Sequence, residues 1–141
     1  MTAESLFSLA GMLVLPGWLL LVVAPRWKWS QRYATFVAPL LIGGLYAWVF
    51  ATHYGEGRGG FGSLADVGLL FQNPWLLLAG WVHYLAFDLF TGAWETRDAA
   101  RCGIPQLVVI PCLVLTFLVG PVGLLLYLSI RVIWRKEIDP A

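Results

Sequence analysis

Four long apolar segments occupy most of this sequence and restrict its fold more than any other feature. A helix needs about 20 apolar residues to cross the hydrocarbon core of a bilayer. A soluble domain of 141 residues has no core large enough to bury four such helices. The sequence therefore predicts an all-α polytopic membrane protein, in which residues 1–141 form one bundle of four transmembrane helices. We expect these helices at about residues 5–24, 33–52, 74–94 and 105–131.

The composition supports a membrane protein and excludes several soluble classes. Only 12% of the residues are charged, about half of the roughly 25% that is usual in soluble domains. The net charge of +1 provides no basic surface for nucleic acid. The first segment lacks the basic start and the cleavage site of a secretory signal, so we interpret it as a retained helix. We expect the protein to be an integral membrane protein of the bacterial inner (cytoplasmic) membrane.

The fourth segment is too long for one straight transmembrane helix. The run between Arg101 and Arg131 contains no charged residue. A straight helix of that length would span about 43 Å, whereas the hydrocarbon core is about 30 Å thick. The run contains Pro111 and, further on, Gly120 followed by Pro121. We therefore predict a long tilted helix with a kink near Gly120-Pro121, and two shorter helices are the alternative.

Two capping signals mark the starts of helices. Asn73 followed by Pro74 is typical of a helix start, because asparagine caps the first turn and proline fits within it. Ser63 and Asp66 resemble a capping box and follow a glycine-rich loop. The second signal predicts a short helix at the membrane interface.

The basic residues indicate orientation only weakly. With four spans, the first and third connections share one side, and the second connection and the C-terminal end share the other. The N-terminal tail has no positive residue, which favours an N-terminus outside the cell. On this topology the inner side carries Arg26, Lys28, Arg32, Arg97 and Arg101, and the outer side carries Arg58, Arg131, Arg135 and Lys136.

Ionisable residues in the third segment are the strongest functional signal, because a carboxylate deep in a membrane is costly. Asp88 lies four residues beyond Tyr84, the midpoint of a helix over residues 74–94, so the two share a face. His83 is rotated about 140° from Asp88 and is expected to meet another helix or a ligand. The polar face is a stripe of Trp81, Tyr84, Asp88, Thr91 and Glu95.

Two interpretations of this stripe remain open. In the chemical one, burial keeps the Asp88 carboxyl partly protonated, so that it donates a proton to a substrate and later accepts one, with Tyr84 orienting it. In the structural one, Asp88 satisfies a partner on another helix or on a loop. His83 is either a catalytic group or a packing residue. We expect Trp81, Phe87, Thr91 and Glu95 to contact a substrate if one binds.

The remaining polar residues offer weaker signals. A solvated interfacial role is favoured for Glu95, Arg97, Asp98 and Arg101, with Asp98 and Arg101 at ion-pair spacing. Few metal ligands are available, so we expect no metal and no cofactor, although Asp88 and Asp98 could together hold a divalent ion with a pyrophosphate. Trp94 is expected to close the third helix at the membrane interface. A stripe of Gly43, Ala47 and Ala51 would let another helix approach closely.

Three stretches of the sequence together resemble one family. They are "LPGWLLLVVAPRW" at 15–27, "WVHYLAFDLFTGAW" at 81–94 and "PCLVLTFLVGPVGLLLYL" at 111–128. In combination they resemble the abscisic-acid-deficient-four-like membrane proteins, whose plant members are associated with making the carotenoid neoxanthin. The resemblance is strongest around His83, Tyr84, Phe87 and Asp88.

The resemblance implies a four-helix membrane protein and isomerisation of a carotenoid epoxide to an allene. This chain lacks the chloroplast-targeting extension of the plant members, so it resembles a bacterial-type member. Our own hypothesis assigns the acid role to Asp88, helped by Tyr84, and the base role to His83. Binding and isomerisation of a carotenoid or related isoprenoid lipid is therefore the first functional prediction. The alternative is a non-catalytic membrane subunit or assembly factor, packed against a larger complex or a second copy.

Overall fold

The computed structural model describes residues 1–135, and every regular element within that range is helical. This confirms the all-α prediction. The short elements η1 (Tyr33–Val37) and η2 (Tyr54–Glu56) continue neighbouring helices as π-helical and 3₁₀ turns. The other elements are α1 (Ala3–Val23), α2 (Lys28–Arg32), α3 (Ala38–His53), α4 (Leu64–Leu70), α5 (Pro74–Cys102), α6 (Gln106–Val119) and α7 (Pro121–Arg135).

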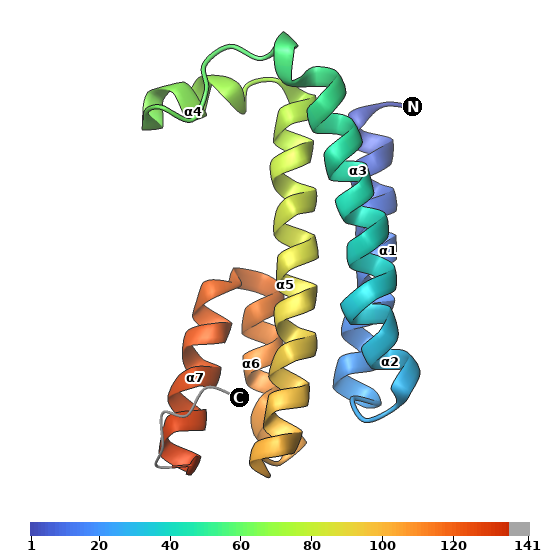
Figure 1. The fold of residues 1–141 in the computed structure, drawn as a ribbon, viewed down its shortest axis with the longest axis vertical. Helices are drawn as coiled ribbons and strands as arrows, with labels where there is room; N and C mark the ends of the chain where they lie inside the picture. The colour runs from blue at the N-terminus through green and yellow to red at the C-terminus, as the bar shows by residue number, and fades with distance from the viewer. Residues whose placement is uncertain (136–141) are drawn as a thin grey trace.

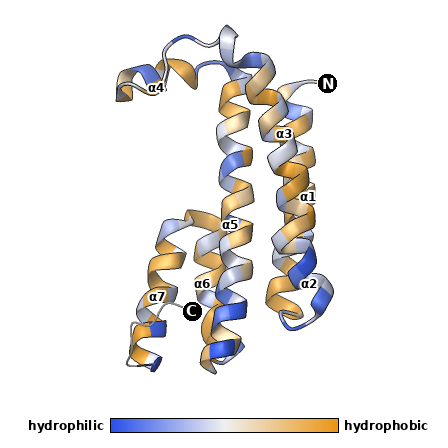
Figure 2. Cartoon of the chain, viewed as in Figure 1, coloured by the Kyte–Doolittle hydropathy of each residue, from blue (hydrophilic) through white to orange (hydrophobic). Residues whose placement is uncertain are grey.

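Three helical stretches of the described chain are long and apolar enough to cross a membrane. They are α1, the continuous stretch Lys28–Glu56 that contains α3, and α5. The three run side by side as the trunk of the molecule (Figure 1), and α5 packs against both of the others. Hydrophilic residues gather mainly towards the two ends of this trunk, with apolar stretches between them (Figure 2). These three helices fit a membrane protein, as the first three apolar segments predicted.

The prediction of four membrane-spanning helices is wrong, because the fourth segment forms two helices. These helices have 14 and 15 residues, or about 21 to 23 Å each, too short to cross the hydrocarbon core. The chain turns at Gly120, where φ is 17° and ψ is −81°, and then runs back along α6 (Figure 1). We call this pair the α6–α7 hairpin. The predicted break at Gly120-Pro121 is thus a reversal of direction, and the alternative of two shorter helices is confirmed.

Close packing explains why the chain reverses here and does not merely bend. Pro121 has no backbone N–H and cannot continue a helical hydrogen-bond ladder from α6. Gly123 then allows α7 to lie against the backbone of α6, since a Cβ at position 123 would come within 2.1 Å of the Thr116 nitrogen. A local sequence signal can predict the break, but this contact between the two helices sets its angle.

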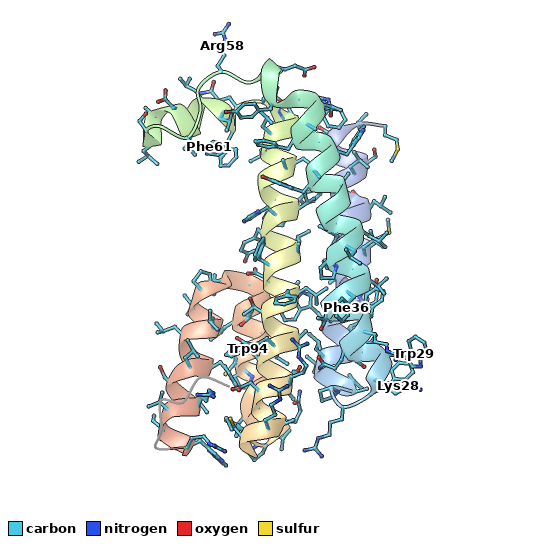
Figure 3. All side chains as sticks on the ribbon, in the orientation of Figure 1. Lys28, Trp29, Phe36, Arg58, Phe61 and Trp94 are labelled. Carbon is cyan, nitrogen blue, oxygen red and sulfur yellow. The ribbon has the colours of Figure 1, made fainter. Side chains whose placement is uncertain are left out.

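The hairpin changes which basic residues share an end of the molecule. Its base lies beside the C-terminal end of α5, at the same end of the molecule as the connection between α1 and α2, whereas its tip reaches the middle of α5 (Figure 1). Figure 3 shows Lys28 at this end and Arg58 at the opposite end. We call the first the basic end, and its described basic residues are Arg26, Lys28, Arg32, Arg97, Arg101, Arg131 and Arg135. Lys136 lies outside the described residues.

The helix α5 is longer than predicted, and this moves its centre. It continues past Trp94 to Cys102 and stops at Gly103, which adopts a left-handed conformation with φ of 70°. The midpoint of Pro74–Cys102 is therefore Asp88 and not Tyr84. Trp94 (Figure 3) therefore does not close this helix as predicted, and its ring packs edge-on against Tyr127 of α7 at 5.5 Å.

Both predicted helix starts are confirmed. The Asn73 side chain accepts a hydrogen bond from the Trp75 amide at 2.9 Å, with Pro74 in the first turn of α5. The Ser63 hydroxyl caps α4 by accepting from the Asp66 amide at 3.1 Å and donates to the Asp66 carboxylate at 2.7 Å. The short helix α4 extends sideways from the trunk at the end opposite the basic end (Figure 1).

Candidate functional site

One face of α5 carries a stripe of residues that are spaced alternately four and three positions apart. This spacing keeps side chains on one side of a helix. The first part, which we call the upper stripe, comprises Leu77, Trp81 and Tyr84. The second part, the lower stripe, comprises Asp88, Thr91, Glu95 and Asp98. The residues of the predicted stripe from Trp81 to Glu95 therefore share one face of α5, and the stripe continues by one further carboxylate, Asp98.

The tip of the α6–α7 hairpin lies directly against Asp88. A Cβ added to Gly120 would lie 2.5 Å from the Asp88 Oδ1 atom, so a larger residue here would require the Asp88 carboxyl group to shift. The Tyr84 hydroxyl lies close enough to interact with both the Asp88 carboxyl and the Gly120 backbone. The other carboxyl oxygen, Asp88 Oδ2, is buried and has no hydrogen-bond partner among the described residues. The predicted pairing of Asp88 with Tyr84 is consistent with this arrangement.

Glu95 lies beneath the hairpin, away from solvent and lipid. Its exposed fraction is 0%, and its Oε1 atom accepts a hydrogen bond from the buried Thr116 hydroxyl of α6 at 2.9 Å. The second oxygen, Oε2, has no partner in the described part of the chain. The solvated role expected for Glu95 is therefore wrong. In this position Glu95 is covered by protein and does not line a groove open to a substrate.

Asp98 forms the second contact between the stripe and the hairpin. Its Oδ2 atom accepts hydrogen bonds from the Tyr127 hydroxyl at 2.5 Å and from the Arg131 Nε atom at 2.6 Å. The carboxylate is 1% exposed, so its predicted solvated role is also wrong. The Asp98 ion pair is formed with Arg131 of α7 and not with the nearby Arg101 that the sequence spacing suggested.

Sequence reasoning missed the residues that the hairpin contributes. Tyr127 and Arg131 are four positions apart in a largely apolar segment, and this spacing puts both on one face of α7. Thr116 is the corresponding polar residue of α6. That pattern could have indicated a polar partner for α7, although it could not have identified α5.

Arg97 points to another side of α5. Its guanidinium donates to the Gln31 side chain at 2.9 Å and to the Thr35 hydroxyl at 2.6 Å. Gln31 also donates to the Thr96 hydroxyl at 2.8 Å. These contacts tie the lower part of α5 to α2 and η1, so Arg97 has a structural role and not the solvated one that we expected.

His83 lies apart from Asp88, as its rotation around the helix predicted. Its ring contacts Tyr46 of α3 at 5.6 Å and Phe87 at 4.7 Å, measured between ring centroids. Phe87 is 62% exposed and belongs to this side of α5, outside the stripe. The structure therefore does not bring together the proposed acid, Asp88, and the proposed base, His83.

Two shallow apolar grooves flank α5 above the hairpin tip, and Phe71 separates them. Phe71 follows α4 and packs over Gly80, where an added Cβ would lie 3.2 Å from the phenyl ring. Both grooves are lined by Phe71 and Gly80. The first, which we call the stripe groove, also contains Leu77, Trp81 and Tyr84. The second, the histidine groove, includes His83, Tyr46, Phe50 and Phe61.

The chemistry available at the site is proton exchange. Within residues 1–135, no group of three or more His, Cys, Asp or Glu side chains is arranged to hold a metal ion. Asp88 and Asp98 are ten residues apart on α5, or about 15 Å along the helix axis, which is too far for one ion to bridge. By contrast, a carboxyl group with a free oxygen, beside a phenol at the foot of an apolar groove, can give and take a proton.

Comparisons with known proteins support the resemblance found in the sequence. Residues 5–127 match the ABA4-like family, described as ABA DEFICIENT 4-like. No curated protein and no solved structure matches the chain. The match extends from α1 to residue 127 and so includes both stripe parts, α6 and the first part of α7. This protein belongs to the ABA DEFICIENT 4-like family.

Proposed function

We propose that this protein binds a carotenoid or a related isoprenoid lipid along the upper stripe of α5 and isomerises it with Asp88 as the acid. The observation that carries this proposal is the position of Asp88. Its carboxyl lies at the midpoint of α5, against the hairpin tip, with a buried and unpartnered oxygen. Membership of the ABA DEFICIENT 4-like family is consistent with the proposal.

The stripe groove suits an elongated apolar ligand. Its lining is aromatic and aliphatic, and Trp81 and Leu77 are 42% and 55% exposed. Exposed aromatic side chains at membrane depth offer flat surfaces on which a conjugated chain can stack. A ligand lying along this groove would meet Tyr84 and then Asp88 at its lower end.

The proposed reaction converts an epoxide into an allenic alcohol. The Asp88 carboxyl donates its proton to the epoxide oxygen as one carbon–oxygen bond breaks, and a base removes a proton from the neighbouring polyene carbon. One proton is added and one is removed, so substrate and product are isomers. His83 faces the other groove, which argues against its predicted role as base. The Asp88 carboxylate left by the first step is the better candidate, and Tyr84 orients it.

We also propose that the basic end faces the cytoplasm, with the N-terminus outside, in a bacterial inner membrane. Positive residues near membrane helices are retained on the cytoplasmic side. The hairpin gathers Arg131 and Arg135 at the same end as Lys28, opposite Arg58. A membrane-impermeant thiol reagent should label Arg58→Cys in intact cells and Arg135→Cys only after lysis, in a background with Cys102 and Cys112 replaced by serine. The reverse pattern would contradict this orientation.

The function is tested by purifying the protein from a carotenoid-producing host and recording its visible absorbance and lipid mass spectrum. Bound polyene is expected in the wild type and in Asp88→Asn, because the amide has nearly the same size. Conversion of an epoxy-carotenoid should fall by about 10²–10⁴-fold in Asp88→Asn. The control is Asp66→Asn, in the first turn of α4. Undiminished conversion by Asp88→Asn would show that Asp88 takes no part in the reaction. A colourless wild-type protein would contradict the proposed polyene ligand.

A non-catalytic membrane subunit is the second candidate, because the small residues of α3 are unused within the chain. An added Cβ at Gly43 or Gly44 would meet nothing within 4 Å. Ala47 and Ala51 are exposed, so the stripe can accept a helix of another protein or of a second copy. A colourless protein that copurifies with a second polypeptide would favour this candidate.

A further inference from the structure

The lower stripe contains an unusual concentration of unsatisfied carboxyl oxygens. Among the described residues, the buried side-chain oxygens and nitrogens without a hydrogen-bond partner are Asp88 Oδ2, Glu95 Oε2 and Asp98 Oδ1. All three lie on one face of α5 and are covered by one element, the α6–α7 hairpin. Buried polar atoms are normally paired, because each unpaired one costs free energy. Three unpaired carboxyl oxygens in one row along α5 therefore require an explanation.

Packing and ion pairing do not supply that explanation. The Arg131 guanidinium and the Tyr127 hydroxyl both bind Asp98 Oδ2 and leave Oδ1 without a bond. Glu95 receives one hydroxyl bond, from Thr116, and its other neighbours include the buried thiol of Cys112. For packing alone, an apolar residue at position 95 would fit the interior of the bundle better than a carboxyl group.

We infer that the α5–hairpin interface is a proton path, which connects water at the basic end with Asp88 through Asp98 and Glu95. Each free oxygen is then a site where a proton or a bridging water molecule binds during transfer. A transfer moves one proton from a carboxyl or a water molecule to the next oxygen, and it requires no oxidant or reductant.

The arrangement along α5 suits such a path. Asp98 lies near the base of the hairpin, Glu95 one turn further in, and Asp88 at the tip, about 10 Å beyond Glu95 along the axis. Thr91 shares the face between Glu95 and Asp88, and Thr116 faces it from α6. The hairpin shields this row of polar side chains from the lipid, whereas the side chains of the upper stripe remain exposed.

The path would answer a need of the proposed function, on which this part of the inference rests. Asp88 is 14 residues from either end of α5, or about 21 Å along the helix axis. To act as an acid, it must hold a proton when substrate arrives. His83 lies on another side of the helix and cannot supply that proton directly. Within a turnover Asp88 recovers a proton from the polyene carbon, so the path would supply the first proton and replace any proton that is lost between turnovers.

Infrared spectroscopy of the protein in lipid nanodiscs tests the path without any substrate. The carbonyl band of the protonated Asp88 carboxyl is identified by its loss in Asp88→Asn, and its shift after transfer into D₂O gives the rate of proton exchange. In the wild type we expect exchange to be complete soon after mixing. In Glu95→Gln, which keeps the size and the Thr116 hydrogen bond, exchange should slow by about tenfold or more. The matched control is Glu56→Gln, the same substitution in the exposed η2 turn, which should exchange like the wild type.

A third variant separates proton transfer from packing. Glu95→Asp retains a titratable group and should exchange faster than Glu95→Gln, even though its side chain is shorter. Equal slowing in both variants would mean that Glu95 contributes packing alone, and wild-type exchange in Glu95→Gln would mean that protons reach Asp88 by another route. Either result overturns the path, as would the absence of a protonated Asp88 band. A colourless protein with Glu95-dependent exchange would instead overturn the proposed function and leave the path intact.

Discussion

The upper and lower stripes belong to one face of one helix, yet they have opposite environments. In the upper stripe, apolar and aromatic side chains lie open to the membrane, with Trp81 42% exposed. In the lower stripe, the charged side chains are the hidden ones, with Glu95 0% and Asp98 1% exposed. The difference comes from the α6–α7 hairpin, which covers the face below Gly120 and leaves the face above it free.

This contrast shows how a membrane protein can hold carboxyl groups within the span of a helix. A lipid-facing carboxylate would cost several kcal/mol, so the hairpin supplies hydroxyl groups and a guanidinium at the same depth. The two parts are thus expected to respond differently to substitution. Changes in the lower stripe or its cover should affect stability, and changes in the upper stripe should affect ligand binding.

The largest effect is expected where the hairpin is packed most tightly. Gly123→Ala would force a methyl group against the Thr116 backbone, so α7 must move away from α6, at a cost of about 1–3 kcal/mol or more. Equilibrium unfolding in mixed micelles measures this cost. In the control Gly44→Ala, the new methyl group meets nothing within 4 Å, and helix propensity favours alanine. Equal stability of the two variants would mean that the hairpin is not held by this contact.

The ion pair of Asp98 discriminates between the partner predicted from the sequence and the one found in the structure. Arg131→Gln removes the guanidinium that lies 2.6 Å from Asp98 and should lower the thermal midpoint by several degrees. Arg101→Gln, at an exposed position near the end of α5, should change it little. Thermal unfolding in detergent, followed by circular dichroism, compares the two. A larger loss from Arg101→Gln would contradict the hairpin contact.

In the upper stripe, the expected effect is on ligand binding. Trp81→Ala removes one aromatic surface from the stripe groove, and such a contact contributes about 0.5–1.5 kcal/mol, or roughly two- to tenfold in polyene affinity. The variant should unfold close to the wild type, because Trp81 is not a core residue. Trp29→Ala, at a tryptophan that is 51% exposed at the basic end, serves as the control. Polyene quenching of tryptophan fluorescence gives the affinity, and unchanged binding by Trp81→Ala would exclude this groove.

The smallest effect is expected at the boundary between the two grooves. Gly80→Ala would bring a methyl group within 3.2 Å of the Phe71 ring. Because the ring can shift and alanine favours the helix, the change in stability should stay within about 0.5 kcal/mol. The shifted ring should still alter the visible spectrum of a bound polyene. A loss of stability as large as that of Gly123→Ala would show that Phe71 is a fixed part of the fold.

Much of the fold could be predicted from local signals. The apolar segments gave three span-capable helices, and the caps at Ser63 and Asn73 gave the starts of α4 and α5. The spacing of Tyr84 and Asp88 correctly put them on one face. The end of α5 was predicted too early, because the charges from Glu95 to Arg101 were interpreted as a membrane boundary. Charged residues mark the membrane–water interface only where no neighbouring helix covers them.

The amino-acid sequence by itself determined the helical class, the membrane-compatible lengths and the order of residues along the α5 stripe, since these depend on composition and on the helical period. The tertiary structure alone decided that the last segment folds back, that Arg131 and not Arg101 pairs with Asp98, and that Glu95 is buried. Glycine and proline at positions 120 and 121 weaken a helix locally, although α1 and α6 continue through Pro16 and Pro111. The direction taken afterwards depends on contacts between α5, α6 and α7, which are distant in sequence and meet only in the folded chain.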